Sequence, residues 1–456
     1  MSSPSTFAYR KLARLLPGIA LLAAVTTGRA DPPDIERVTE ALVAEALEAN
    51  LGLQAVEAGV AERLAALNQA RARFLPAIDL QLRYSRAEGG REIELPIGGP
   101  DNPSFRVQRE REQDSLIRLT QPLYDARISA ASRAAAHGHD ASRFGLEAAR
   151  LQLARDVRQA YYRWLATGEA VTILQATREL AEENRRVNDS LHRHGKVTRD
   201  LVLRAEADLL EVEQQLLRAQ STETLARRYV NLLCNAPLDR ALEATAVTAG
   251  ELPGFAARIR APSPDAAAME DAALARRAEL RELDAGLRAA SEQEQLARAA
   301  FRPQLSLALD AGTQGPRWNY GDDDPYLLAS LVVRFNLWNG GADRAALTAA
   351  RARSRQLGAS RELAAQRIRL EVQEAQSALA VAGASLQTAA RRAEAAAAAF
   401  TIVARKRDLG QVPPAEYLDA ERALTAARQN ANVTRFDFLS AVAQLGYAIG
   451  GLEQSR

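Results

Sequence analysis

Cysteine is almost absent from this chain of 456 residues, in which Cys234 is the single example. One cysteine cannot form an intrachain disulfide, and Cys234 lies too far from the N-terminus to be the acylated cysteine of a lipoprotein. A free cysteine usually packs as a small apolar side chain. We therefore expect Cys234 to fill a small apolar space near the end of a helix.

Long hydrophobic runs are also missing after the N-terminal segment. None approaches the roughly eighteen residues of a membrane-spanning helix, which excludes a helical membrane protein. Membrane strands stay possible, because side chains that alternate between two faces escape hydropathy windows.

A signal peptide is predicted over residues 1–30. Arg10, Lys11 and Arg14 precede an apolar stretch at 15–25, and small residues end the segment at Ala30. We expect cleavage after Ala30, with an uncleaved anchor as the alternative. The segment holds four of the 59 basic residues, so 55 basic and 57 acidic residues would remain. A nearly neutral exported chain gives no reason to expect nucleic acid as a partner.

Motifs of catalysis are absent as well. The sequence has no phosphate-binding loop, dinucleotide fingerprint or nucleophile elbow. The four histidines form the pairs His137/His139 and His192/His194. Helical positions two apart point to nearly opposite sides, and neither pair has a further ligand at the usual spacing for a metal. We therefore expect no enzyme activity, no cofactor and no metal site, so that energy must come from a partner.

One motif is present twice. The segment from Phe74 to Leu82 returns from Phe301 to Leu309, with proline at the third position of each copy. Each copy leads through a second strand-like segment into a proline-free run of about seventy residues. Such a run, if helical, is about 100 Å long, which indicates a tube or a strut rather than a compact domain.

The same order of elements is predicted in both halves. From Leu123 to Gly195 is 72 positions and from Leu337 to Gly410 is 73, which makes the duplication structural. We expect residues 31–240 to be a first repeat (helix, β-hairpin, long helix, tip, helix), 241–264 a linker at mid-height and 265–456 a second repeat. The predicted helices are 38–73, 126–194, 199–235, 265–300, 342–409 and 414–449. The predicted strands are 78–85, 114–123, 304–311 and 326–337. The loops that join them into hairpins are 89–113 and 312–325.

Helix lengths and strand number predict the architecture. The short helices of each half together match the long helix beside them, so each half would be one long helix against two stacked short ones. Ile78, Leu80 and Leu82 alternate with polar residues, which gives a strand with one apolar face. Four such strands cannot close a barrel alone, because the smallest single-chain membrane barrels have about eight. Several chains must therefore share one barrel. The fold class is mainly α with a small β part.

These features together resemble the TolC-type outer-membrane efflux proteins, over essentially residues 35–450. The doubled Phe-x-Pro strand start, the exit Leu337-Trp338-Asn339-Gly340-Gly341 and the glycine turns carry the resemblance. The first hairpin exit, from Leu123 to Arg127, departs from it by lacking paired glycines. The resemblance implies a homotrimer with a shared twelve-stranded barrel in the outer membrane of a Gram-negative bacterium and a helical tunnel across the periplasm.

The resemblance also implies a function and partners. Such proteins are passive exit ducts of tripartite efflux or type I secretion systems, joined by a periplasmic adaptor to an inner-membrane pump of the RND, ABC or MFS type. Drugs, metal ions and secreted polypeptides stay open as substrates, because selection lies mainly in the pump. The alternative is a secreted helical coiled-coil scaffold without a pore, which would have no use for amphipathic strands.

The two glycine turns match the family's periplasmic tips, where the adaptor binds. Glycine in the left-handed conformation also caps helices in general, so capping alone is the alternative role. The residues concerned are Gly195, Lys196, Val197 and Thr198 at the first turn and Gly410, Gln411, Val412 and Pro413 at the second.

Two acidic residues follow the second turn. Glu416 and Asp419 are three positions apart and therefore share one helix face. In the family, acids at these offsets form rings that narrow the closed entrance, which implies a periplasmic gate. The alternative is that acids are simply favoured near a helix N-terminus, by a few tenths to about 1 kcal/mol.

Overall fold

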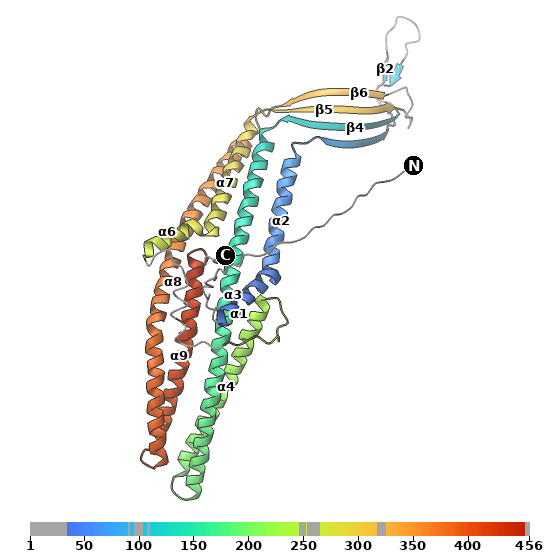
Figure 1. Cartoon of the computed structure of the whole chain (residues 1–456). Helices are drawn as coiled ribbons and strands as arrows, with labels where there is room; N and C mark the ends of the chain where they lie inside the picture. Colours follow the sequence, from blue (N-terminus) through green and yellow to red (C-terminus); the bar gives the residue numbers. More distant parts are fainter. Residues whose placement is uncertain are drawn as a thin grey trace, which may run out of the picture.

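The computed structural model describes residues 34–89, 92–94, 104–106, 110–245, 252, 265–316 and 325–451. The predicted signal peptide, most of the predicted linker and the tips of both strand loops lie outside these residues. Figure 1 shows a long molecule with a β-sheet at one end and two helical hairpins at the other. Within the described part of the chain, no helix combines the length and the apolar character needed to cross a membrane.

The sheet joins the two halves of the chain. Its four strands are antiparallel in the order β1-β4-β5-β6, so the β1–β4 and β5–β6 hairpins meet where β4 pairs with β5. Both predicted hairpins are confirmed. Their predicted bounds differ from the observed ones, because β4 begins inside the predicted loop, β5 runs beyond residue 311 and β6 ends before the predicted residue 337. The bounds are β1 (Ala77–Arg86), β4 (Arg111–Tyr124), β5 (Gln304–Gly315) and β6 (Pro325–Arg334), and the first loop holds β2 (Glu92–Glu94) and β3 (Ser104–Arg106).

The two faces of the sheet differ as predicted. Leu80 pairs with Ile117 on one face, where their side chains are exposed. The opposite face carries Arg118, which forms an ion pair of 2.7 Å with Asp310 on β5. Side chains alternate along a strand, so one face is apolar and the other polar.

The helices form two tiers beside the long helices α3 and α8. In the tier near the sheet, neighbouring contacts run α2–α3–α7–α8, and in the tier near the tips they run α4–α3–α9–α8. The stacking of short helices beside each long one is confirmed (Figure 1). The bounds are α1 (Asp34–Ala49), α2 (Leu51–Ala72), α3 (Ala126–Arg193), α4 (Arg199–Leu233), α6 (Ala266–Arg276), α7 (Ala278–Arg298), a 3-10 turn at Ala299–Phe301, α8 (Ala342–Asp408) and α9 (Pro414–Ala448).

The prediction of one unbroken helix before each hairpin was wrong. The first breaks at Asn50 and the second at Arg277, each 24 positions before the repeated phenylalanine. The Asn50 side chain accepts a hydrogen bond from the Leu53 amide at 2.9 Å and donates one to the Leu233 carbonyl at 2.8 Å. It thus caps α2 while holding the end of α4.

Arg277 fixes the second break. Its side chain is buried and forms ion pairs with Glu279 at 2.9 Å and Glu371 at 3.0 Å. It also donates to the Ala448 carbonyl at 3.3 Å and lies 4.5 Å from the centre of the Tyr447 ring. A buried guanidinium requires such partners. The α6–α7 break is therefore tied to α8 and to the end of α9.

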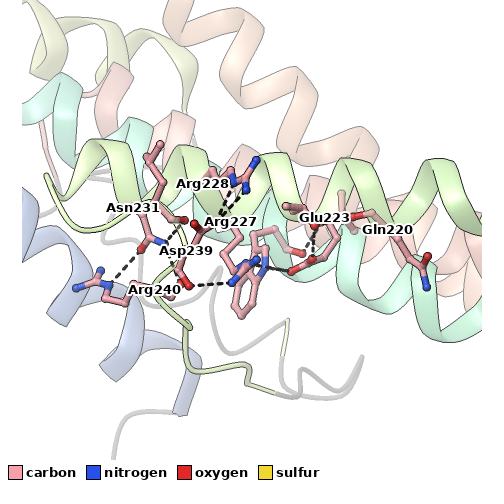
Figure 2. Close-up of polar contacts among 11 residues, drawn as sticks. Gln220, Glu223, Arg227, Arg228, Asn231, Asp239 and Arg240 are labelled. Carbon is pink, nitrogen blue, oxygen red and sulfur yellow. Dashed lines mark hydrogen bonds and ion pairs between the residues drawn. The ribbon is translucent and has the colours of Figure 1, made fainter.

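The end of α4 is tied down at mid-height (Figure 2). Asn231 is fully buried and donates to the carbonyls of Leu238 at 3.1 Å and Arg240 at 2.9 Å. The Arg240 side chain returns a bond to the Asn231 amide oxygen at 3.1 Å, and Arg228 pairs with Asp239 at 3.0 Å. The chain after α4 therefore folds back along the helix.

The main core lies at the same height. Tyr161 and Trp164 of α3 are buried with ring centres 5.7 Å apart, and they pack with apolar residues of α1, α8 and α9. These aromatic residues therefore pack the core where the helices meet. Cys234 is 1% exposed beside the same core and follows the last residue of α4, as predicted.

Candidate functional site at the helical tips

The first tip closes α3 with a glycine in the left-handed conformation. Gly195 has φ +70°, and its amide bonds the His192 carbonyl at 2.8 Å. The next amide, that of Lys196, bonds the Leu191 carbonyl at 2.9 Å. These two bonds satisfy carbonyls that the end of the helix would leave without a partner.

The second tip repeats this geometry. Gly410 has φ +71°, and its amide bonds the Arg407 carbonyl at 2.8 Å. The Gln411 amide bonds the Lys406 carbonyl at 2.9 Å. Because bonds of the same span recur at both turns, the two tips are structural copies, as the repeat predicted.

The residues after the glycines begin the returning helices. Thr198 is the N-cap of α4, but among the described residues its hydroxyl bonds the Asp200 carboxylate and no backbone amide. Pro413 is the N-cap of α9 and Pro414 its first residue, a position where proline is favoured. Val197 and Val412 are half-buried, whereas the other six predicted tip residues are exposed.

The predicted gate residues share one exposed face of α9. Glu416 and Asp419 both point to solvent, while Tyr417, Glu421 and Leu424 of the same turns are buried. The structure therefore places the two carboxylates together, in the first three turns after the second tip. No cluster of His, Cys, Asp or Glu suited to a metal ion exists among the described residues.

The junction between the two hairpins contains polar residues that the sequence analysis missed. Asp208 of α4 is buried and forms an ion pair with Arg422 of α9 at 2.7 Å. Farther from the tips, the Thr177 and Thr425 hydroxyls of α3 and α9 lie 2.9 Å apart. Asp208 occurs in a helical stripe of buried residues with Ala205 and Val212, and that spacing could have revealed it.

The two outer helices of the tier near the tips, α4 and α8, carry exposed apolar residues on their outer sides. The α4 edge shows large side chains that point away from α3, and Leu217 is 68% exposed. We call the residues Leu203, Leu210, Leu217, Leu225 and Leu232 the α4 stripe. The exposed apolar residues of α8 extend from the level of α7 to the second tip and are Leu363, Leu370, Val381, Ile402 and Leu409.

A further exposed apolar group surrounds the junction of strands and helices. Its members come from the ends of all four long strands and include Trp338, which is 83% exposed. Aromatic residues at the rim of a strand region are typical of a membrane–water boundary. The rim residues are Phe74, Leu75, Leu123, Tyr124, Phe301, Phe335, Leu337 and Trp338.

Comparison with known proteins defines the class. A family model for outer membrane efflux proteins matches residues 42–233 and 270–451, one segment for each half of the chain. The chain therefore belongs to the outer membrane efflux protein family. The pyoverdine export outer membrane protein OpmQ of Pseudomonas putida is 26% identical over 411 residues, which cover 88% of this chain and 83% of OpmQ.

Solved structures share the fold. The CmeC outer membrane channel of Campylobacter jejuni has a TM-score of 0.77 at 17% identity, over 93% of this chain and 88% of CmeC. The outer membrane protein VceC of Vibrio cholerae has a TM-score of 0.74 at 18% identity, over 91% of this chain and 96% of VceC.

Family membership confirms the main predictions. The chain is an outer-membrane efflux channel of a Gram-negative bacterium with a large periplasmic portion, and the alternative of a secreted scaffold is not favoured. The fold class, with long helices in a tunnel and four strands given to a shared barrel, is also confirmed. The family works as a trimeric channel with adaptor and pump partners.

Proposed function

We propose that three copies of this chain form the passive exit duct of a tripartite efflux or type I secretion system, without catalysis of their own. One observation carries the proposal: the sheet and both helical tiers end on the same two sides of the molecule. The sheet ends at β1 and β6, and the helical tiers end at α2 and α4 on the β1 side and at α8 on the β6 side. Joining these edges in a head-to-tail ring pairs the open strands and covers the exposed leucines.

The duct would span the outer membrane at the sheet. The apolar sheet face would contact lipid, and the rim residues would lie at the periplasmic boundary of the membrane. The helices would then carry the polar passage across the periplasm. We also propose that residues 31–240 and 265–456 are two structural repeats, which the matching tips and matching helix breaks support.

We propose that both tips contact the periplasmic adaptor. Their shared geometry presents the same backbone turn twice per protomer. In each turn a half-buried valine, Val197 or Val412, follows the glycine by two positions. Gly195, Lys196, Val197 and Thr198 would act together with Gly410, Gln411, Val412 and Pro413. Through this repeated surface the adaptor would join the duct to an inner-membrane pump of the RND, ABC or MFS type.

We propose that Glu416 and Asp419 form the periplasmic gate. They are exposed on α9 next to the second tip, and the buried stripe on the other side of α9 fixes the direction in which they point. Three protomers would place six carboxylates around one opening.

The experiment that tests the duct is assembly of the mature protein. We expect it to fractionate with outer membrane, to crosslink as a trimer and to conduct ions in planar bilayers, because open strand edges require partners. A soluble monomer with helical circular dichroism would contradict the duct.

The Gly410→Val substitution tests the tip. A β-branched residue at φ +71° is strained, so we expect unfolding free energy to fall by about 1 kcal/mol or more and export in cells to drop, with trimers still in the outer membrane. The control is Gly358→Val in α8, where φ is not positive and the space is open. Full export by the Gly410→Val protein would count against adaptor contact at this turn.

A further inference from the structure

A carboxylate occupies a core position of α9. Tyr417, Glu421 and Leu424 follow helical spacing and are all buried, and Glu421 is only 2% exposed. Neither of its carboxylate oxygens has a hydrogen-bond partner among the described residues. A buried carboxylate without partners strongly favours its neutral, protonated form.

The groups that face Glu421 come from the neighbouring helices. Asp208 lies on α4 and Arg407 on α8, while Arg422 and Tyr417 lie on α9 itself. Burial first, and then the charge of Asp208, raise the pKa of the Glu421 carboxyl from 4.5 to about 7. From α3, Glu183 interacts through its charge with Arg407, the same arginine that faces Glu421.

Neither arginine neutralises Glu421 in this arrangement. Arg422 is held by Asp208, with donor–acceptor distances of 3.2 and 2.7 Å. Arg407 donates to Asp408 at 3.1 Å and lies 4.0 Å from the centre of the Tyr417 ring. One nitrogen of Arg407 is buried without a hydrogen-bond partner in the described part of the chain, so the junction there contains both an unused donor and an unused acceptor.

We propose that Glu421 is a proton-controlled latch between the two helical hairpins, closed when its carboxyl is protonated and released when the proton leaves. A charged Glu421 would repel Asp208 and attract Arg407 and Arg422, which favours a second arrangement in which the carboxylate gains an arginine partner. The Asp208–Arg422 bond between α4 and α9 would weaken as a result. This latch rests on the proposed gate, because the junction holds the α9 segment that carries Glu416 and Asp419.

The sign of the pH effect follows from the raised pKa. A carboxyl that binds its proton more tightly in the packed junction than in the loosened one stabilises packing at low pH. That stability is lost as pH rises from about 4.5 to about 7 and stays constant above this range. The channel should therefore open more readily at neutral than at acidic pH.

The test is the open probability of the trimer in planar bilayers. Between about pH 5.5 and about pH 7.5 we expect the opening equilibrium to rise roughly tenfold per protomer. Glu421→Gln, which keeps the size of a neutral carboxyl, should hold the low open probability at both pH values. Glu421→Leu, which matches the apolar stripe, should also lose the pH response.

Two controls isolate the latch. Glu282→Gln removes another carboxyl whose pKa burial raises, but on α7 in the tier near the sheet, and it should keep the parental response. The response should also persist when Glu416 and Asp419 are both alanine, which removes any contribution of the gate carboxylates. A parent with a flat pH profile, or a Glu421→Gln channel with the parental profile, would overturn the latch.

Failure of the duct itself would give a different result. If the parent trimer never conducts, the proposed function is contradicted, and the latch is judged by amide hydrogen exchange in the purified protein. After correction for intrinsic exchange, residues 418–425 should then exchange faster at the higher pH in the parent and not in Glu421→Gln. Equal exchange in both proteins would overturn the latch independently.

Discussion

Replacing Glu416 and Asp419 together with alanine is expected to weaken strongly the block of the channel by spermine added from the periplasmic side. In a trimer, the six carboxylates would surround one narrow opening, where their charges add in a partly water-excluded space. Spermine, a flexible polyvalent cation, is attracted by charge alone. We expect the concentration for half-block to rise about tenfold or more, with a loss of cation selectivity, in single-channel recordings.

The matched control removes acids near the other tip. Asp200→Ala with Glu206→Ala deletes two exposed carboxylates from the first turns of α4. If Glu416 and Asp419 served only the helix dipole, both double variants would lose a few tenths to about 1 kcal/mol per acid and leave block unchanged. Equal block of the parent and the Glu416→Ala/Asp419→Ala channel would show that no acidic ring exists.

Replacing Leu210 and Leu217 with glutamate is expected to prevent trimer formation. Both belong to the α4 stripe and are 59% and 68% exposed in the single chain. Burying a leucine contributes roughly 1.5–3 kcal/mol, and a buried unpaired carboxylate opposes association further. A ring of three protomers contains this interface three times, so the loss of association free energy occurs three times. We expect monomers in sedimentation and no conductance.

The comparison variant carries the same two charges outside the stripe. Gln215 and Gln220 are exposed on the flanks of α4, so their replacement by glutamate should leave trimers intact. Circular dichroism of the Leu210→Glu/Leu217→Glu protein should stay helical, because these side chains point away from the core of their own chain. Stable trimers of this variant would place the protomer interface elsewhere.

Much of the site was predictable because its causes are local. Gly195 and Gly410 take the left-handed conformation that ends a helix, and Pro413 and Pro414 can only begin the next one. These preferences act within a few residues, so they can be recognised in the sequence. Asp208 and Glu421 were missed although each follows the spacing of a buried helical stripe, and which groups face them is decided by helices that are distant in the chain.

The sequence by itself determined the doubled order of elements, the two faces of the strands and the position of the turns. Proline, glycine and alternating apolar residues impose these features through short-range sterics and periodicity. Tertiary structure alone decided the breaks at Asn50 and Arg277. Asn50 breaks its helix where it can reach the Leu233 carbonyl, and Arg277 where it can reach Glu371 and the end of α9. Tertiary structure also decided that β4 pairs with β5. These two strands lie far apart in the chain, and packing of the helices beneath them brings their edges together.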